Sequence, residues 1–444
     1  MKLVKVLDGL PLALATAGAY LSQVATTLSE YLSDYEASWL ELHITTPEVT
    51  EYEDRMIYST WKISYDHVQR QNELSAKLLQ LWAYLDNQDV WLELLQHTDQ
   101  DDPEWIREIT KNKLKFNAAV RVLCDHGLVE VDQSLFESVE SRGYSMHGCV
   151  HAWTIYVLNQ KWDVGLARLA LKFVGSHVPG SEKNKWWATQ RRLLQHANRC
   201  SNLILKDSFE GEGVEWAIHM LGYLYADQGK LDEAEKMYER ALVGYEKAWG
   251  PDHTSTLSTV NNLGNLYADQ GKLDEAEKML QRALVGKEKA LGPDHTSTLD
   301  TVNNLGLLYA DQGKLDEAEK MYERALVGKE KAWGPDHTST LDTVNNLGNL
   351  YADQGKLDEA EKMYERALVG YEKALGSEQV ATYIPALNTM QNLALLLSSV
   401  GRPRESRDLY TRAQAGVEIV FGHASSRYEK VVEALARLSV DEAS

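Results

Sequence analysis

The chain has 444 residues, which is enough for two or three domains of ordinary size, each with its own core. Its formal net charge of -20 produces an acidic field that repels the phosphates of nucleic acids and of anionic membrane surfaces, so we expect neither as a partner. The three cysteines, Cys124, Cys149 and Cys200, are odd in number and widely spaced, which excludes a disulfide framework and favours a reducing, cytoplasmic location.

Residues 1–45 are expected to be helical. The apolar run from Leu10 to Leu21 follows two lysines and contains alanines spaced like a cleavage site, so it also imitates a signal peptide. Because Asp8 and Pro11 interrupt the apolar stretch that a signal peptide needs, we favour an ordinary buried helix. No other stretch approaches the roughly 20 apolar residues of a membrane-spanning helix.

Residues 46–160 are rich in tryptophan and leucine and predict helices over 73–84 and 117–126. The apolar alternation at 128–131, then a polar stretch, then residues 144–146, predict a small hairpin. Helices followed by a hairpin favour a winged-helix-like domain, and residues 161–215 are expected to be connecting helices.

Two short motifs give this half of the chain a family resemblance. Gly-Leu-Pro-Leu at residues 9–12 and Met-His-Gly at residues 146–148 resemble the Gly-Leu-Pro-Leu and Met-His-Asp motifs of the NB-ARC nucleotide-switch ATPases, in the same order and at a fitting separation. The resemblance implies that Pro11 packs near an adenine and that His147 contacts the ADP phosphate and holds the closed state. The alternative for both residues is plain packing.

The chain departs from that family in what it lacks. It contains no Gly-x-x-x-x-Gly-Lys-Ser/Thr phosphate loop, and Gly148 stands where the family has an aspartate. We therefore expect no nucleotide hydrolysis, no catalytic residue and no cofactor in this chain, with ADP or ATP bound only if an upstream nucleotide-binding half exists. Residues 1–45 are then the helical remnant of a switch module, and we expect the sequence to begin midway through it.

A metal site is suggested by His147, Cys149 and His151, because histidines four residues apart share a helix face. No fourth ligand is in view, so a structural thiol and a helix start are the preferred interpretation, and we expect no metal.

From residue 216 the chain repeats itself. The string Gly-Lys-Leu-Asp-Glu-Ala begins at four positions that lie 42 residues apart, namely Gly229, Gly271, Gly313 and Gly355. Each unit contains two stretches with apolar residues at helical spacing. Neither helix could bury its apolar stripe alone, so the units are expected to stack into a solenoid.

The residues between the helices indicate where each helix begins and ends. We expect Gly313 to end the first helix of its unit in a left-handed conformation and Gly334 with Pro335 to end the second. Ser297 and Asp300 are spaced as a capping box that would open the first helix. One histidine recurs per unit in a Pro-Asp-His turn, and we interpret these residues as loop and helix-start residues rather than metal ligands: His253, His295 and His337.

These units resemble the tetratricopeptide repeat. Its Leu-Gly-x-x-Tyr signature begins at Leu221, Leu263, Leu305 and Leu347, and alanines follow at the positions of close helix packing. The 42-residue unit is longer than the usual length of about 34 and is similar to the variant in kinesin light chains. A fifth, weaker unit covers residues 389–421 after a linker four residues longer, and 422–444 form a helix and tail.

The expected fold is therefore mainly α, with a winged-helix-like N-terminal region followed by an α-solenoid of about five tetratricopeptide repeats over residues 216–421. The whole order, part of an NB-ARC and winged-helix module followed by near-identical repeats, resembles the NOD-like receptor relatives of filamentous fungi.

In this repeat family the first helix of each pair lines the concave face. The resemblance places there the amides of Asn261, Asn262, Asn265, Asn303, Asn304, Asn345, Asn346 and Asn349. Amides donate and accept, so they can bind the backbone of an extended peptide, and the alternative is that they bond only to neighbouring helices or water. Asp269, Asp311 and Asp353 recur beside this face and favour a ligand with a basic segment, or else they form a solvated acidic face.

The sequence predicts a protein-interaction scaffold or sensor of the NOD-like type, whose repeats bind a protein or peptide ligand. The alternative is a stand-alone adaptor that resembles kinesin light chain. The ligand, an upstream effector domain, the oligomeric state and self-association all stay open at this point.

Overall fold

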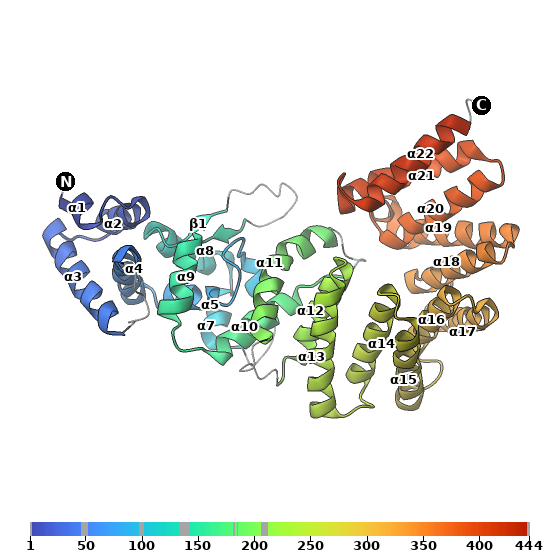
Figure 1. Cartoon of the computed structure of the whole chain (residues 1–444), viewed down its shortest axis with the longest axis horizontal. Helices are drawn as coiled ribbons and strands as arrows, with labels where there is room; N and C mark the ends of the chain where they lie inside the picture. The colour runs from blue at the N-terminus through green and yellow to red at the C-terminus, as the bar shows by residue number, and fades with distance from the viewer. Residues whose placement is uncertain are drawn as a thin grey trace. The chain divides into compact units, whose positions relative to one another are not determined.

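The computed structural model describes residues 2–45, 52–96, 102–132, 142–180, 183, 185–205 and 212–441. The chain forms two compact units, of which unit 1 is Met1–Val178 with Ala188–Leu221 and unit 2 is Pro179–Trp187 with Gly222–Ser444 (Figure 1). No helix in the described ranges is both long and apolar enough to cross a membrane.

Unit 1 is built from short and medium helices and one small hairpin. Its elements are α1 (Lys2–Val6), α2 (Pro11–Gln23), α3 (Leu28–Thr45), α4 (Tyr52–Gln71), α5 (Glu73–Trp82), α6 (Leu92–Leu95), α7 (Glu104–Ile109), α8 (Lys113–Asp125), β1 (Glu130–Val131), β2 (Tyr144–Ser145), α9 (Gly148–Trp153), the π-helical turn η1 (Thr154–Leu158), α10 (Val164–Ser176) and α11 (Trp186–Ile204). Helix α12 (Glu215–Asp227) contributes residues to both units.

The apolar run near the N-terminus forms the buried helix α2. Ala13, Ala17 and Tyr20 of α2 belong to one core cluster together with Ile63 of α4. The indole Nε1 of Trp61 in α4 also donates to the hydroxyl of Thr16 in α2, over 3.3 Å. The two helices are therefore held by apolar packing and by one buried hydrogen bond.

The predicted hairpin is confirmed. Strands β1 and β2 pair antiparallel, with Glu130 opposite Ser145 and Val131 opposite Tyr144, and Val90 bridges to Tyr144. The two predicted helical runs lie largely within α5 and α8. Helices followed by a hairpin are thus present in unit 1, and the winged-helix assignment of this region stays a prediction.

A buried ion pair fixes the loop between α5 and α6 to α11. The guanidinium of Arg192 donates two hydrogen bonds of 2.6 Å to Asp89 and lies 3.9 Å from the ring centre of Trp91. The backbone N–H of Asp86 donates to Nδ1 of the buried His196 at 3.1 Å. Bidentate geometry and a stacked aromatic ring offset the cost of burying these charges.

Unit 2 is a stack of helix pairs, seen in Figure 1 as helices that follow one another from α13 to α22. The first helices of the pairs are α14 (Thr254–Asp269), α16 (Thr296–Asp311), α18 (Thr338–Asp353) and α20 (Ile384–Ser399). The second helices are α13 (Leu231–Trp249), α15 (Leu273–Leu291), α17 (Leu315–Trp333), α19 (Leu357–Val380) and α21 (Pro403–Phe421), and α22 (Ser426–Asp441) follows. The predicted α-solenoid is confirmed.

The recurring histidines open the first helices, as predicted. His253, His295 and His337 are the N-cap residues of α14, α16 and α18, and Nδ1 of each accepts the backbone N–H two residues later. The predicted capping box at Ser297 and Asp300 is wrong, because His295 already supplies the acceptor and Ser297 lies inside the first turn.

The predicted helix ends are confirmed at both glycines. Gly313, directly after the C-cap of α16, has φ +74°, and Gly334 after α17 has φ +92°. The left-handed region suits glycine because it has no Cβ.

The two helices of each repeat approach closely at the glycine of the Leu-Gly-x-x-Tyr signature. A Cβ on Gly348 would lie 2.7 Å from Cε1 of the Tyr364 ring, and one on Gly306 would lie 2.8 Å from Tyr322. Both tyrosines are nearly fully buried. The glycine therefore makes room for the ring that fills the space between the paired helices.

Successive second helices are joined by ion pairs that recur at each repeat. The N–O distances are 2.5 to 2.6 Å in the pairs Arg282–Glu246, Arg324–Glu288 and Arg366–Glu330. Each side chain keeps about a third of its surface exposed, and exposed pairs contribute only about 0–1 kcal/mol. Apolar burial between the helices is therefore the main source of stability.

We expect Gly348→Ala to lower the free energy of unfolding by about 1–3 kcal/mol, because the added methyl overpacks against Tyr364. Urea unfolding followed by circular dichroism measures the change. Lys320→Ala, at an exposed position of α17, is the matched control and should stay within about 0.5 kcal/mol of the parent. Equal midpoints for the two variants would contradict the packing argument.

Candidate ligand-binding site

The predicted asparagines lie on the first helices of three successive repeats. We call this set the amide row: Asn261, Asn262 and Asn265 on α14, Asn303 and Asn304 on α16, and Asn345, Asn346 and Asn349 on α18. Asn261 and Asn345 are buried, with 7 % and 8 % of their surface exposed, and the others are half-buried.

Hydrogen bonds connect the amide row from one helix to the next. Nδ2 of Asn304 donates to Oδ1 of Asn261 at 3.2 Å, and Nδ2 of Asn346 donates to Oδ1 of Asn303 at 3.4 Å. These amides therefore bond to neighbouring helices, as one of the two sequence interpretations expects. Each amide has more donors and acceptors than one such bond uses, so the row keeps capacity for a ligand.

The row continues onto α20, which the sequence analysis missed. Nδ2 of Asn392 donates to Oδ1 of Asn349 at 2.8 Å, and the Thr389 hydroxyl lies 2.8 Å from Oδ1 of Asn345. The sequence could have predicted this extension. The linker before the last repeat is four residues longer, so the repeat position of Asn346 recurs 46 residues later, at Asn392, rather than after 42 residues.

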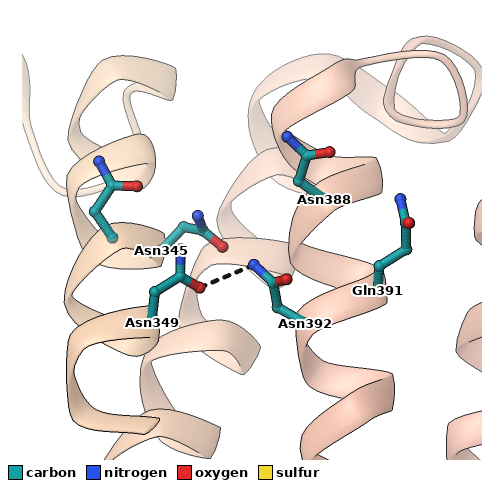
Figure 2. A pocket seen from close by; sticks show the side chains of 6 residues that line it. Asn345, Asn349, Asn388, Gln391 and Asn392 are labelled. Carbon is teal, nitrogen blue, oxygen red and sulfur yellow. Dashed lines mark hydrogen bonds between the residues drawn. The ribbon is translucent and has the colours of Figure 1, made fainter. Parts of the chain in front are cut away.

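A pocket of about 280 Å³ opens between α18 and α20 at this step. Figure 2 shows Asn349 of α18 and Asn392 of α20 facing one another, with the bond between them drawn. All its lining side chains are neutral amides: Asn345, Asn346, Asn349, Asn388, Gln391 and Asn392.

The predicted aspartates lie at the last positions of α14, α16 and α18. Partial desolvation, and then the neighbouring carboxylate of Asp311, raise the pKa of Asp269 above its usual range. The pKa of Asp311 is raised by desolvation and by Asp353 in the same way. The three carboxylates, Asp269, Asp311 and Asp353, thus form a line of negative charge in which neighbours interact.

Two lysines of the second helices, Lys287 and Lys329, are buried against the first helices. Nζ of Lys329 lies 2.8 Å from the Asp300 carboxylate. Nζ of Lys287 donates to the Thr301 hydroxyl at 3.0 Å, and burial lowers the pKa of Lys287 to about 8. The next second helix, α19, has a tyrosine at this position, so the charge is confined to two repeats.

That tyrosine, Tyr371, donates to the Asp342 carboxylate over 2.6 Å. Burial raises the pKa of Asp342 to about 6, against the lowering effects of this hydrogen bond and of Lys329. A carboxyl group that protonates near pH 6 therefore lies on α18, close to the amide row.

The two residues of the NB-ARC resemblance both lie at helix starts in unit 1. Pro11 is exposed at the first position of α2. His147 is the N-cap of α9, where its Nδ1 accepts the N–H of Cys149 at 3.2 Å. These are local capping roles, and the nucleotide contacts stay a prediction.

The residues considered for zinc are used otherwise. Nε2 of His151 lies 3.2 Å from the carbonyl oxygen of Trp82 and 3.1 Å from that of Leu85, so it is directed at backbone. Among the residues that the structure describes, no group of three or more His, Cys, Asp or Glu side chains could hold a metal ion.

Comparison with known proteins defines the class of unit 2. The sequence profile of the tetratricopeptide repeat family matches residues 214–289, 256–331, 297–373 and 339–419. Together with the stacked helix pairs, these matches make this part of the chain a tetratricopeptide-repeat solenoid.

A curated relative extends the comparison. A nucleotide-binding leucine-rich repeat (NLR)-like protein of the fungus Hyaloscypha variabilis is 30 % identical over 275 residues, which is 59 % of this chain and 25 % of the relative. The chain is thus NLR-like and carries tetratricopeptide repeats, as its resemblance to fungal NOD-like receptor relatives implied. It spans about a quarter of the length of that relative.

Two solved structures are also similar. One is a signal transduction ATPase with numerous domains (STAND) and a tetratricopeptide repeat sensor from Pyrococcus horikoshii, with 13 % identity and a TM-score of 0.46 over 96 % of this chain and 62 % of that one. The other is a putative kinesin light chain from Podosopora anserina with nearly identical repeats, with 24 % identity and a TM-score of 0.38 over 48 % and 98 %.

We expect Asp342→Asn to change how stability depends on pH. The pKa of Asp342 is raised from 3.8 to about 6 in the folded chain, so between these values the folded state holds a proton that the unfolded state has lost. The contribution of this carboxyl to stability therefore falls as pH rises through that window. Asparagine removes the titration and leaves a neutral group, as Asn388 already does at the same place in the next repeat.

The measurement is the melting temperature of both proteins at several values between about pH 4 and pH 7. The parent should lose melting temperature relative to Asp342→Asn as pH rises. Asp274→Asn, at an exposed position of α15, is the control and should keep a constant offset. A constant offset for Asp342→Asn would contradict the assignment.

Proposed function

We propose that the repeat array binds a protein or peptide ligand along the amide row, and that this binding is the sensing step of an NLR-like signalling protein. The observation that carries the proposal is the continuity of the row: hydrogen-bonded amides run over α14, α16, α18 and α20. The proposal is a binding function and includes no catalytic step.

The spacing of the row suits an extended peptide. Packed helices lie about 8–10 Å apart, and an extended chain advances about 3.3 Å per residue, so one repeat meets about three peptide residues. A peptide that touches all four first helices would then have about ten residues. Its backbone groups would meet amides that both donate and accept.

In the tetratricopeptide family the first helices line the concave side, and we carry this assignment over to the amide row. We further propose that unit 1 connects the array to a nucleotide switch, in which Pro11 and His147 would lie nearest the nucleotide. Nucleotide is expected only where an upstream nucleotide-binding half is present, so the test uses a protein that includes that half. Loss of ADP binding on His147→Ala in it, measured by calorimetry, would support this part, and unchanged ADP affinity would contradict it.

The proposal also includes a cytoplasmic location, because Cys124, Cys149 and Cys200 are unpaired thiols. The rival function is an adaptor in which the repeats act without a switch, like kinesin light chain. Both functions use the amide row for binding, and they differ in whether a nucleotide alters the affinity.

We expect peptides selected from a random display library on the full chain to depend on the amide row. A double variant with Asn303→Ala and Asn346→Ala should bind them at least about fivefold more weakly, because each lost hydrogen bond contributes about 0.5–1.5 kcal/mol. Fluorescence anisotropy measures the dissociation constants. Val285→Ser, at an exposed position of the second helix α15, is the control and should bind as the parent does.

Equal binding by the parent and the Asn303/Asn346 variant, with melting temperatures that confirm folding, would refute this assignment of the ligand surface. If only Val285→Ser lost binding, the ligand surface would be assigned to the second helices instead.

We also expect the line of aspartates to favour ligands with a basic segment. Replacing both Asp269 and Asp311 by asparagine should weaken binding of a lysine-rich peptide about two- to tenfold at low salt and should reduce its salt dependence. A neutral peptide of equal length serves as the control and should bind both proteins alike. If the lysine-rich peptide also bound the parent and the variant with equal affinity, the aspartates would form a solvated acidic face without a role in ligand binding.

A further inference from the structure

The pocket between α18 and α20 differs from the corresponding place one repeat earlier by three substitutions, of which one, Gln391 in place of Asn345, keeps an amide. The position of Asn349 is occupied by Leu307 one repeat earlier, and the position of Asn388 is occupied by Asp342. At the step from α16 to α18 an apolar and an acidic side chain therefore stand where α18 and α20 present amides. Comparison with the preceding, near-identical repeats therefore shows that a lining made of amides alone is found between α18 and α20 and not between α16 and α18.

The amide of Asn349 is held in one orientation. The hydroxyl of Tyr364 donates to its Oδ1 at 2.8 Å, and Nδ2 of Asn392 donates to the same oxygen at 2.8 Å. Tyr364 is buried, so its phenol hydrogen needs this acceptor. With both lone pairs of Oδ1 used, Asn349 offers a ligand only the donors on Nδ2.

The amide of Gln391, on α20, is also held in one orientation, but there the nitrogen is bonded within the protein and the oxygen is left for a ligand. Its Nε2 donates to the backbone carbonyl of Leu387, one turn earlier in α20, at 3.1 Å. Reversing the amide would place two oxygens against each other. Its Oε1 is therefore the atom with which Gln391 can accept a hydrogen bond from a ligand.

The pocket thus pairs a donor on α18 with an acceptor on α20, and no charged side chain lines it. A carboxylate could not donate to Gln391, and it would enter a protein with a net charge of -20. An ammonium group could not accept a hydrogen bond from Asn349. Its transfer from water would also cost free energy, because the lining has no negative charge to pair with it. An amide group both accepts and donates, and it is neutral.

We propose that this pocket binds a neutral side-chain carboxamide of the peptide ligand, that of glutamine or asparagine. The inference rests on the proposed function and names the chemistry recognised at one end of the amide row. A volume of about 280 Å³ suits one side chain rather than a whole ligand.

The test uses the full chain and four capped pentapeptides. Their central residue is glutamine, alanine, glutamate or lysine, and their other residues are glycine. Saturation-transfer NMR at millimolar concentration gives the dissociation constants. We expect the glutamine peptide to bind more tightly than the glutamate and lysine peptides. An alanine peptide that binds as well as the glutamine peptide would show that the side-chain carboxamide is not recognised and would overturn the inference.

The key variant is Asn349→Leu, which copies the residue at position 307. The fold accepts leucine there, because the preceding repeat already combines Leu307 with Tyr322 at the same spacing. We expect glutamine-peptide binding to weaken about two- to tenfold, the range for one or two lost hydrogen bonds. Val285→Ser, at an exposed position of the second helix α15 and outside the pocket and the amide row, is the control and should bind as the parent does.

A second variant, Asn388→Asp, copies Asp342 and gives the pocket a negative charge. It should lower the preference for the glutamine peptide over the lysine peptide. Equal binding of all four peptides, no binding of any of them, or equal loss in Asn349→Leu and Val285→Ser would overturn the inference. If the Asn303/Asn346 variant loses binding of the peptides selected by display while Asn349→Leu keeps its binding of the glutamine peptide, the inference about the pocket is wrong and the proposed function is still supported.

Discussion

The structure of unit 2 depends on one close approach, that of the two helices within each repeat. Where a glycine such as Gly348 faces a second-helix ring, the distance is too short for any Cβ, and the ring fills the space that results. This contact sets the angle and distance of each pair, so it also sets where the first helices stand relative to one another. The ion pairs between second helices are half-exposed and follow this arrangement rather than create it.

The amide row is a consequence of the same geometry. Once first helices stack side by side, asparagines at one repeat position come within reach of asparagines one repeat away. The bonds use some donors and acceptors and thereby fix the orientation of those that are left. A row that is partly satisfied from within offers a ligand a defined pattern of donors and acceptors, which a set of free surface amides would not.

Much of unit 2 could be predicted from the sequence, because its period, its glycines and its histidines each have a local physical meaning. Gly313 and Gly334 end helices where a left-handed residue was required, and His295 opens one. The capping box failed because two side chains competed for the same turn and spacing alone cannot decide between them. The partners of buried Lys329 and Tyr371 could not be predicted, because they depend on contacts between helices and not on local pattern. In unit 1 the hairpin was predictable from alternation, but the Asp89–Arg192 pair spans more than a hundred residues without a local signal.

The register of the bonds has a consequence for how the array can change in length. The amide bonds join residues 43 positions apart and the ion pairs join residues 36 positions apart, so inserting or deleting a whole 42-residue unit recreates every one of them. Recombination among the near-identical units can therefore lengthen or shorten the binding row without a cost in packing. Only the α20 side of the all-amide pocket is outside this exchange, because Asn388 and Gln391 belong to the divergent last repeat, whereas Asn349 belongs to an exchangeable unit. The length of ligand that the array spans can therefore change with the number of units, while the residues that α20 contributes to the terminal pocket stay the same.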